Sequence, residues 1–321
     1  MSEISHRFVD VNGLRMHIAE AGAGPLVLLL HGFPECWYSW RHQLPVIAAA
    51  GYRVVAPDQR GYCRTGGPAE VPAYTILHTV GDVVGLIAAL GEERAVVVGH
   101  DWGAPVAWHA ALLRPDLIHG VVALSVPHRP RSSRPPVATM REVLGDGFYM
   151  AYFQRPGAPE EEFERDLTDT FRRVLYAASG EAGGATGGLV PVVPAGGGFL
   201  DICPAPAELP GWLTEDDIAT YSAEFAPTGF TGPVNWYRNL DRNWELTAAW
   251  HRAPLTPPAL FVGGDRDMVV AQPRTKELIE GMRGFVPNLR DTIWLPGCGH
   301  WTQQERPAET NAAILDFVAS I

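Results

Sequence analysis

Asp101 is the residue whose type and position in this chain most clearly indicate chemistry. It stands at the centre of Gly-His-Asp-Trp-Gly (99–103), between an apolar segment at 95–98 and an alanine-rich helical pattern at 104–113. Small residues on both sides suit a sharp turn from strand to helix, which presents a nucleophile at the edge of a sheet. The alternative is that Asp101 merely caps the helix that follows.

The choice of aspartate over serine indicates which kind of carbon is attacked. No Gly-x-Ser-x-Gly sequence, the serine version of this turn, occurs in the chain. A serine that attacks an sp3 carbon would leave an ether that water does not readily cleave, whereas an aspartate leaves an ester that water hydrolyses. Asp101 therefore predicts substitution at a carbon such as that of an epoxide or a carbon–halogen bond, and not acyl transfer.

A histidine and an acid follow Asp101 in the chain order expected for this kind of turn. His300 comes shortly after an apolar segment at 292–295, and it would take a proton from the water that cleaves the ester. Asp267 follows the apolar segment at 259–262 and would orient His300 and stabilise its charged form. Asp265, two residues earlier, is the alternative orienting acid.

Phe33 and Trp102 are expected to supply backbone N–H groups for the oxyanion of the second step. The sequence His-Gly-Phe-Pro-Glu (31–35) follows an apolar segment at 26–30, where the loop in a fold of this kind contributes one donor. Trp102, next to the nucleophile, contributes the other. His31 is interpreted as a structural hydrogen-bonding residue, and the isomer of the bond before Pro34 is left open.

Short apolar segments separated by turn residues predict strands that are buried on both faces. They lie at 26–30, 52–56, 95–98, 121–124, 259–262 and 292–295, after a hairpin at 7–11 and 14–18 with an Asn-Gly turn. Helical patterns alternate with them at 79–90, 104–113 and 308–318. The predicted fold class is α/β, with a mostly parallel, doubly wound sheet.

The alternation of strands and helices stops between about residues 126 and 254. This stretch has proline-rich ends, a helical pattern at 160–177 and a glycine-rich run at 180–198 that predicts a loop. We interpret it as an inserted, mostly helical cap over the edge of the sheet at which ligands bind. The predicted division is a core domain of residues 1–126 and 254–321 and a cap domain of residues 127–253.

Composition excludes several classes of function. The chain has 321 residues, 46% of them hydrophobic, and a net charge of −11. Because a negatively charged chain repels phosphate backbones, no nucleic-acid partner is predicted. No apolar run is long enough to span a bilayer, and no secretory signal precedes the hairpin, so no membrane is predicted. Four scattered cysteines without metal spacing indicate free thiols, a cytoplasmic location and no metal. The oligomeric state is open, with a homodimer as one option.

Five sequence motifs together resemble the α/β-hydrolase-fold epoxide hydrolases of the soluble type, over nearly the whole chain. They are His-Gly-Phe-Pro (31–34), Gly-His-Asp-Trp-Gly (99–103), Tyr-Met-Ala-Tyr-Phe-Gln with Arg-Pro-Gly (149–157), Gly-Pro-Val-Asn-Trp-Tyr-Arg-Asn (232–239) and Gly-His-Trp (299–301). The resemblance implies an α/β-hydrolase fold with an inserted helical cap, an epoxide and water as substrates, and no cofactor.

The resemblance also implies a pair of cap tyrosines that bind the epoxide oxygen. By the motifs these are Tyr149 and Tyr237, with Tyr152 as the competing choice in the first motif. The chemistry agrees, because ring opening creates a basic alkoxide and a phenol is neutral at pH 7 and can donate a proton to it. Aromatic and apolar residues of the motifs predict a pocket for aryl or alkyl epoxides: Phe33, Trp102, Met150, Tyr152, Trp236 and Trp301.

The chain departs from the family pattern in one loop, and two other functions are alternatives. The loop at 58–65 carries Cys63 and Thr65 where the family pattern has glycine and serine, which puts the shape of that loop in doubt. A haloalkane or haloacid dehalogenase would use the same Asp-His-Asp set, but Phe33 and Trp102 stand where such enzymes bind halide or carboxylate. A non-catalytic receptor on the same fold is the remaining alternative.

Overall fold

The computed structural model describes residues 3–182, 192–271 and 273–321. Its centre is an eight-stranded sheet of order β1-β2-β4-β3-β5-β6-β7-β8. The strands are β1 (Ser5–Val11), β2 (Leu14–Ala21), β3 (Leu26–Leu30), β4 (Arg53–Pro57), β5 (Ala95–His100), β6 (Ile118–Leu124), β7 (Ala259–Gly264) and β8 (Leu289–Leu295). From β4 to β8 all neighbouring strands are parallel, whereas β2 runs antiparallel to both β1 and β4. The predicted α/β class with a mostly parallel sheet is confirmed.

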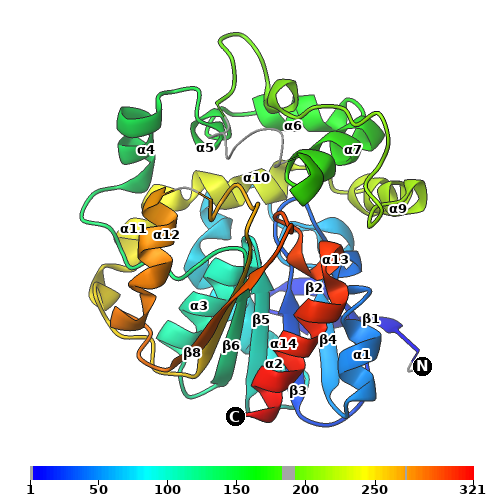
Figure 1. Cartoon of the computed structure of the whole chain (residues 1–321), viewed down its shortest axis with the longest axis vertical. Helices are drawn as coiled ribbons and strands as arrows, with labels where there is room; N and C mark the ends of the chain where they lie inside the picture. The colour runs from blue at the N-terminus through cyan, green and yellow to red at the C-terminus, as the bar shows by residue number, and fades with distance from the viewer. Residues whose placement is uncertain (1–2, 183–191, 272) are drawn as a thin grey trace.

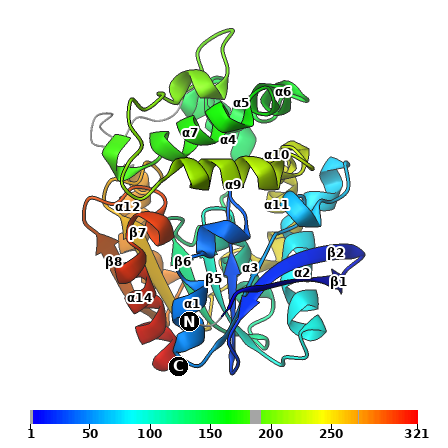
Figure 2. The ribbon, with the colours of Figure 1, turned by 90° about the vertical axis from the view of Figure 1, so that its right-hand side faces the viewer.

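Helices cover both faces of this sheet, as a doubly wound fold requires. The helices of this layer are α1 (Leu44–Ala49), α2 (Ile76–Ala89), α3 (Gly103–Leu113), α12 (Pro273–Glu280), α13 (Thr302–Glu305) and α14 (Pro307–Ala319). α1 and α14 lie on one face and α2 and α3 on the other (Figures 1 and 2). β3 and β5 are buried along their whole length between the two layers.

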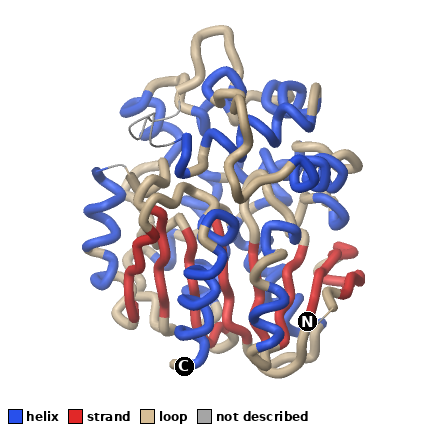
Figure 3. Tube along the Cα trace, turned by 45° about the vertical axis from the view of Figure 1, so that its right-hand side comes forward, coloured by secondary structure: helices blue, strands red, loops and turns tan. Residues whose placement is uncertain are grey.

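The chain between β6 and β7 forms a second group of helices above the carboxyl ends of the strands (Figures 1 and 3). These are α4 (Pro136–Leu144), α5 (Tyr149–Tyr152), α6 (Ala158–Glu164), α7 (Leu167–Ala177), α9 (Glu215–Phe225), α10 (Thr231–Arg238) and α11 (Leu240–Leu246). We use the name cap for this described part of residues 127–253. Short 3-10 helices connect several elements: η1 (Trp37–Trp40), η2 (Cys63–Thr65), η3 (Val71–Tyr74), η4 (Phe199–Ile202), η5 (Ala248–Trp250) and η6 (Met282–Gly284).

The helical pattern predicted at 160–177 is divided into two helices. α6 ends at Glu164, and α7 starts after Asp166, whose backbone is extended and whose carboxylate accepts a hydrogen bond from the Asp169 N–H at 3.0 Å. An aspartate at this position offers the backbone a cap and so favours a helix start over a continuous helix. The glycine-rich run predicted as a loop at 180–198 falls largely on residues 183–191, which lie outside the described residues.

Helix α9 joins the cap to the core by polar contacts. Its acidic residues bind core side chains, since Asp217 accepts from the Tyr38 hydroxyl at 2.9 Å and Glu224 accepts from the Trp37 indole N–H at 3.3 Å. The Tyr221 hydroxyl donates to Gln304 Oε1 at 3.0 Å. These contacts hold the cap over the sheet edge that carries the predicted nucleophile. Among the described residues, no helix is long and apolar enough to cross a membrane.

Candidate active site

Asp101 lies in a left-handed backbone conformation between β5 and α3, with φ of +47°. Such a conformation is strained for a residue with a side chain, and it turns the carboxylate out of the strand toward the cap. The turn is tight because glycines flank it. A Cβ on Gly103 would lie 2.0 Å from the Leu30 carbonyl oxygen, and one on Gly99 would lie 2.2 Å from the Gly103 carbonyl oxygen. The predicted function of the small residues in this run follows from these contacts.

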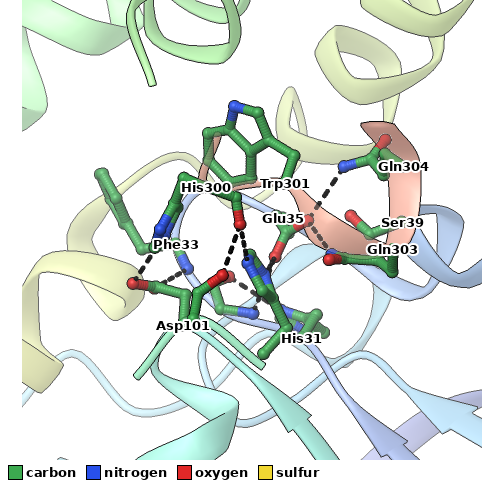
Figure 4. Close-up of polar contacts among 12 residues, drawn as sticks. His31, Phe33, Glu35, Ser39, Asp101, His300, Trp301, Gln303 and Gln304 are labelled. Atoms are coloured by element: carbon green, nitrogen blue, oxygen red, sulfur yellow. Dashed lines mark hydrogen bonds and ion pairs between the residues drawn. The ribbon is translucent and has the colours of Figure 1, made fainter. Parts of the chain in front are cut away.

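The two carboxylate oxygens of Asp101 have different partners (Figure 4). Oδ1 accepts a hydrogen bond from the Phe33 backbone N–H at 2.8 Å, and Oδ2 lies 3.3 Å from His300 Nε2. α3 has no side-chain cap, so the alternative that Asp101 merely caps this helix is wrong. Burial alone would raise the pKa of Asp101, but the adjacent imidazole of His300 lowers it below its usual value, which keeps the carboxylate ionised.

His300 lies between two carboxylates. Its Nδ1 is 3.1 Å from both oxygens of Asp267, on the side opposite Asp101. Burial alone would lower the pKa of His300, but the charges of Asp267 and Asp101 raise it well above its usual value. Because the Nδ1 nitrogen faces a carboxylate, it carries a proton, and Nε2 is left to exchange a proton with whatever lies beside Asp101.

The choice between the two candidate acids is clear from their contacts. Asp267 faces His300, whereas Asp265 accepts a hydrogen bond from the Gly297 N–H at 2.7 Å and thereby holds the loop that leads to His300. Asp267 also accepts from the Val269 N–H at 2.8 Å, which fixes its carboxylate at the end of β7. The geometry therefore favours Asp267 as the orienting acid and gives Asp265 a structural position.

Hydrogen bonds from both the core and the cap fix the backbone of His300. Its carbonyl oxygen accepts from the Ser125 hydroxyl at 2.7 Å, and its N–H donates to the Ala178 carbonyl oxygen at 2.8 Å. Glu305 accepts from the N–H groups of Gly299 and Trp301 on either side of it. These bonds restrict the backbone of His300 and so keep its imidazole beside Asp101.

Tyr149 and Tyr237 come from different cap helices and meet beside the nucleophile. Their rings pack edge to face with centroids 6.2 Å apart, and Tyr237 also packs against Phe33 at 5.4 Å and Trp102 at 5.1 Å. Burial and the negative charge of Asp101 raise the pKa of both phenols well above the usual value. Both hydroxyls therefore remain protonated and able to donate at any physiological pH.

The other tyrosine of the first motif, Tyr152, points away from Asp101. Its hydroxyl donates to Glu162 Oε2 at 2.8 Å inside the cap. Glu162 in turn accepts from the N–H groups of Phe199 and Leu200, so this contact belongs to the framework of the cap. Of the two tyrosines considered for the first motif, the geometry brings Tyr149 to the site.

The tryptophans predicted to line the pocket have structural contacts as well. Trp236 is buried and its indole N–H donates to the Arg60 carbonyl oxygen at 3.0 Å, which ties α10 to the core. Trp301 is buried beside His300, with ring centroids 5.0 Å apart, and its indole N–H donates to the Leu175 carbonyl oxygen at 2.7 Å. Met150 is only partly buried and packs against the hydrophobic core.

One contact supports the prediction that backbone N–H groups bind the oxyanion of the second step. The Phe33 N–H donates to Oδ1 of Asp101, the oxygen that would become the carbonyl oxygen of the predicted ester. Within the described residues the Trp102 N–H makes no hydrogen bond to Asp101, so its part as second donor stays a prediction.

The Phe33–Pro34 peptide bond is cis. His31 is buried and bonds to the Gly32 carbonyl and the Gln59 N–H, which agrees with its interpretation as a structural residue.

A buried cluster of hydrogen-bonded side chains behind the nucleophile was not predicted from the sequence (Figure 4). His100 Nδ1 lies 2.5 Å from Glu35 Oε2, and His100 Nε2 donates to the His300 carbonyl oxygen at 2.7 Å. The side-chain amides of Gln303 and Gln304 donate to the other oxygen of Glu35, at 2.9 and 3.0 Å. This group links the loop of Phe33, the nucleophile turn and the histidine loop. The only sequence signals were the positions of Glu35 and His100 inside recognised motifs.

Two of the four scattered cysteines meet in the fold. Cys36, Asp58 and Cys63 are buried, and their ligand-type atoms lie within 4.8 Å of one another. Burial raises the pKa of both thiols, and the Asp58 carboxylate already accepts from the Trp37 N–H at 3.0 Å and contacts His17 Nδ1 at 2.7 Å. The cluster is thus a hydrogen-bonded part of the core, and Cys63 adopts a φ of +45° where the family pattern has glycine.

Known proteins resemble this chain over its full length. A family model described as alpha/beta hydrolase fold matches residues 25–307. Epoxide hydrolase 3 of Siraitia grosvenorii is 46% identical, covering 99% of both chains, and epoxide hydrolase A of Mycobacterium tuberculosis is 44% identical, covering 100% of this chain and 99% of the relative. The structure of an epoxide hydrolase from an endophytic Streptomyces superposes with a TM-score of 0.94 at 47% identity, covering 98% of this chain and 95% of that one. The chain therefore belongs to the epoxide hydrolase family of the α/β-hydrolase fold.

Proposed function

We propose that this chain hydrolyses epoxides to vicinal diols in two steps, with Asp101 as the nucleophile. The observation that carries the proposal is the pair of protonated, buried phenols, Tyr149 and Tyr237, beside an ionised carboxylate that is held by Phe33 and faces His300. Nucleophile and acid are thus both present in the same site, in the protonation states that ring opening needs.

In the first step Oδ2 of Asp101 attacks a ring carbon of the epoxide. The carbon–oxygen bond of the ring breaks as the ester bond forms, and the electron pair goes to the epoxide oxygen. Tyr149 and Tyr237 donate hydrogen bonds to that oxygen and one of them transfers its proton, so that a hydroxyl group forms in place of a free alkoxide. Attack through Oδ2 leaves Oδ1, which is bonded to the Phe33 N–H, as the carbonyl oxygen of the ester.

In the second step water attacks the carboxyl carbon of Asp101. His300 takes a proton from this water through Nε2, and Asp267 stabilises the imidazolium that results. The negative charge of the tetrahedral intermediate develops on Oδ1, where the Phe33 N–H already donates. Collapse of the intermediate breaks the ester bond, and the leaving oxygen takes the proton of the carboxyl group that forms, which releases the diol and restores the Asp101 carboxylate. The proton held by His300 then returns to the tyrosinate left by the first step, so the protein ends the cycle in its starting state.

The tyrosine pair favours an epoxide over a halide as substrate. A halide leaves as a stable anion and needs no proton, whereas the oxygen of an opened epoxide does. In addition, the side chain of Phe33 is apolar and packs against Tyr237, so it offers no hydrogen bond to a halide. A dehalogenase would gain nothing from two donors whose pKa is raised so far above neutrality.

The proposal is tested by offering the protein matched substrates. Styrene oxide should be converted to phenylethanediol, and 2-phenylethyl bromide should release no bromide under the same conditions. Asp101→Ala should form no diol while its circular dichroism spectrum and melting temperature stay close to those of the parent protein. Release of bromide without diol formation, or full diol formation by Asp101→Ala, would overturn the proposed function.

A further inference from the structure

The histidine loop, which runs from β8 to α13 and carries His300, meets the cap at the end of α7, where the two backbones lie against each other. A Cβ added to Gly180 would lie 2.3 Å from the Gly297 carbonyl oxygen, and one added to Gly299 would lie 2.3 Å from the Gly180 backbone nitrogen. Directly beside this contact the His300 N–H donates to the Ala178 carbonyl oxygen at 2.8 Å. The approach leaves no space for a side chain, so it depends on glycine on both sides.

Glu305, the last residue of α13, joins this part of the cap to the histidine loop through its carboxylate. Its Oε2 accepts from the Gly180 N–H at 2.9 Å and from the Gly299 N–H at 2.8 Å, and its Oε1 accepts from the Trp301 N–H at 3.1 Å. One oxygen therefore holds both a cap residue and a neighbour of the base. Burial raises the pKa of Glu305 and the three N–H groups oppose that rise, so the carboxylate and the two backbone segments stabilise each other.

Gly180 is also bound from the loop of the orienting acid. Its carbonyl oxygen accepts from Arg266 Nη1 at 3.2 Å, and Arg266 directly precedes Asp267, the acid that faces His300. The N–H and the carbonyl group of one cap residue thus bind two different core segments. Through Glu305 the cap holds the loop of the base, and through Arg266 it holds the loop of the acid.

The position of His300 matters most in the second step of the proposed reaction. In the first step Asp101 attacks the substrate, and the proton donors Tyr149 and Tyr237 come from α5 and α10. In the second step His300 Nε2, which lies 3.3 Å from Asp101 Oδ2, has to take a proton from the attacking water. A small shift of the histidine loop would therefore leave ring opening in place but misplace the base of ester hydrolysis.

We propose that Glu305 is a positioning residue for the second step, and that it keeps His300 in place by binding the histidine loop to the end of α7. The inference rests on the proposed epoxide hydrolysis and gives the cap a second part in it. The cap supplies the proton donors of ring opening from α5 and α10, and it fixes the base of ester hydrolysis through Gly180. The three partners of Glu305 are backbone groups, so it acts through the loop and not on the substrate.

The first test is Glu305→Gln, which keeps the shape of the side chain but replaces one acceptor oxygen by a donor. The ester on Asp101 should decay about 10- to 100-fold more slowly than in the parent protein and should form within about threefold of the parent rate. Quenched-flow mass spectrometry after mixing with styrene oxide measures both rates. In steady state kcat and KM should fall by the same factor, because kcat/KM reports only the steps up to the ester. A loss of folded protein would instead lower kcat at constant KM.

The second test, Gly180→Ala, changes the same contact from the side of the cap. The added methyl group would lie 2.3 Å from the Gly297 carbonyl oxygen, so it should push the end of α7 off the histidine loop while Glu305 and His300 are unchanged. Decay of the ester should slow as in Glu305→Gln. The double variant should be little slower than either single variant, because both break one connection. If Glu305→Gln does not fold, Gly180→Ala decides the inference.

The matched control for Glu305→Gln is Glu162→Gln. Glu162 also accepts from two backbone N–H groups, those of Phe199 and Leu200, but both of these belong to the cap. Glu162→Gln should therefore leave the decay of the ester at the parent rate. The control for the glycine variant is Gly211→Ala, a cap residue with open space around its Cβ position, which should also decay at the parent rate.

The outcomes separate this inference from the proposed function. If the parent protein forms the diol but the ester decays at the parent rate in a folded Glu305→Gln or in Gly180→Ala, the inference is wrong and the function stands. Equal slowing of ester formation and decay in these variants would also overturn it, as would slow decay in Glu162→Gln, because the effect would then be a general loosening of the site. If the parent protein forms neither ester nor diol, the proposed function itself fails.

Discussion

Asp101 and His300 are coupled, and their coupling changes during the proposed reaction. In the free protein His300 lies between Asp101 and Asp267, and both charges raise its pKa. Once Asp101 is an ester, its negative charge is gone, and only Asp267 still supports the protonated imidazole. The pKa of His300 should therefore fall at the point in the cycle where a neutral base is needed. Alkylation of the nucleophile thus prepares the base for the second step.

This coupling predicts a pH dependence of stability. The pKa of His300 is raised above its unfolded value and that of Asp101 is lowered, so their interaction is fully present between about pH 4 and 6.5. It is lost as the pH rises through the folded pKa of His300. The free energy of unfolding of the parent protein, measured in urea, should exceed that of His300→Gln most at pH 5 to 6 and least at pH 9. A difference that grows with pH would contradict the assignment.

The tyrosines allow a prediction on the alkylation step. Tyr149→Phe and Tyr237→Phe should each slow it by about 10²-fold, since each removes one donor to the opening oxygen, and the double variant should lose it almost entirely. Stopped-flow tryptophan fluorescence on mixing with styrene oxide would measure the rate. Tyr152→Phe removes a hydroxyl that is bonded to Glu162, so its rate should stay within about threefold of the parent rate. A large loss in Tyr152→Phe alone would reverse the choice of tyrosine.

Individual site residues could be predicted from the sequence to different degrees. Asp101, His300 and Asp267 followed from residue type and chain order, because a nucleophile turn and the loops after two later strands must meet at one sheet edge. Tyr149 and Tyr237 came only from the resemblance. Glu35 and His100 are 65 residues apart, and no local pattern connects partners at such a separation.

At the level of elements, the contact between the Phe33 loop and the nucleophile turn decides where Asp101 points. A Cβ on Gly32 would lie 2.3 Å from Asp101 Cβ and 2.4 Å from its Oδ1. Gly32→Ala should therefore displace the carboxylate and lower kcat/KM by about 10²-fold or more, because misplacement by an ångström has effects of that size. Steady-state diol formation would measure it.

The control for Gly32→Ala is a glycine with open space around it. A Cβ on Gly284, in η6, would meet no atom within 4 Å, so Gly284→Ala should leave kcat/KM unchanged. Equal activity of Gly32→Ala and the parent protein would show that Asp101 is not held by this contact.

Elements with a strong local pattern were predicted well, and short ones were not. β3 matches the predicted segment 26–30 residue for residue, and α3 starts one residue before its predicted position. The hairpin turn at Asn12 and Gly13 has φ values of +49° and +79°, as its sequence indicates. α1 has six residues, too few to show a helical period, and it was missed.

At the level of the whole molecule, the cap must pack closely on the core so that Tyr237 lies beside Asp101. α10 approaches the core where Gly232 meets Gly61, since a Cβ on Gly232 would lie 2.3 Å from the Gly61 carbonyl oxygen. Gly232→Ala should push α10 away from the core. It should lower the free energy of unfolding by about 1–3 kcal/mol and slow alkylation together with it.

A matched variant within the cap separates this effect from a general loss of glycine. Gly211 has open space around its Cβ position, and Gly211→Ala should change neither stability nor rate. Urea unfolding and stopped-flow measurements on the same samples would give both quantities. If Gly232→Ala alkylates at the parent rate, the close approach of α10 is not required for catalysis.

The overall plan of core and cap follows from where the alternation of strands and helices stops in the sequence. How the cap sits on the core does not, because it depends on contacts such as those of Asp217 and Glu224 with the residues of η1, about 180 positions away. The division into domains at residues 126 and 254 stays a prediction.

In the proposed reaction Asp101 forms a covalent ester with the substrate. The most direct test is intact-protein mass spectrometry of His300→Gln after mixing with styrene oxide, because this variant should alkylate but hydrolyse slowly. We expect a mass increase equal to one whole styrene oxide, located by peptide mapping on Asp101 and absent in the double variant with Asp101→Ala. Loss of diol formation in His300→Gln without any adduct, or an adduct on another residue, would contradict it.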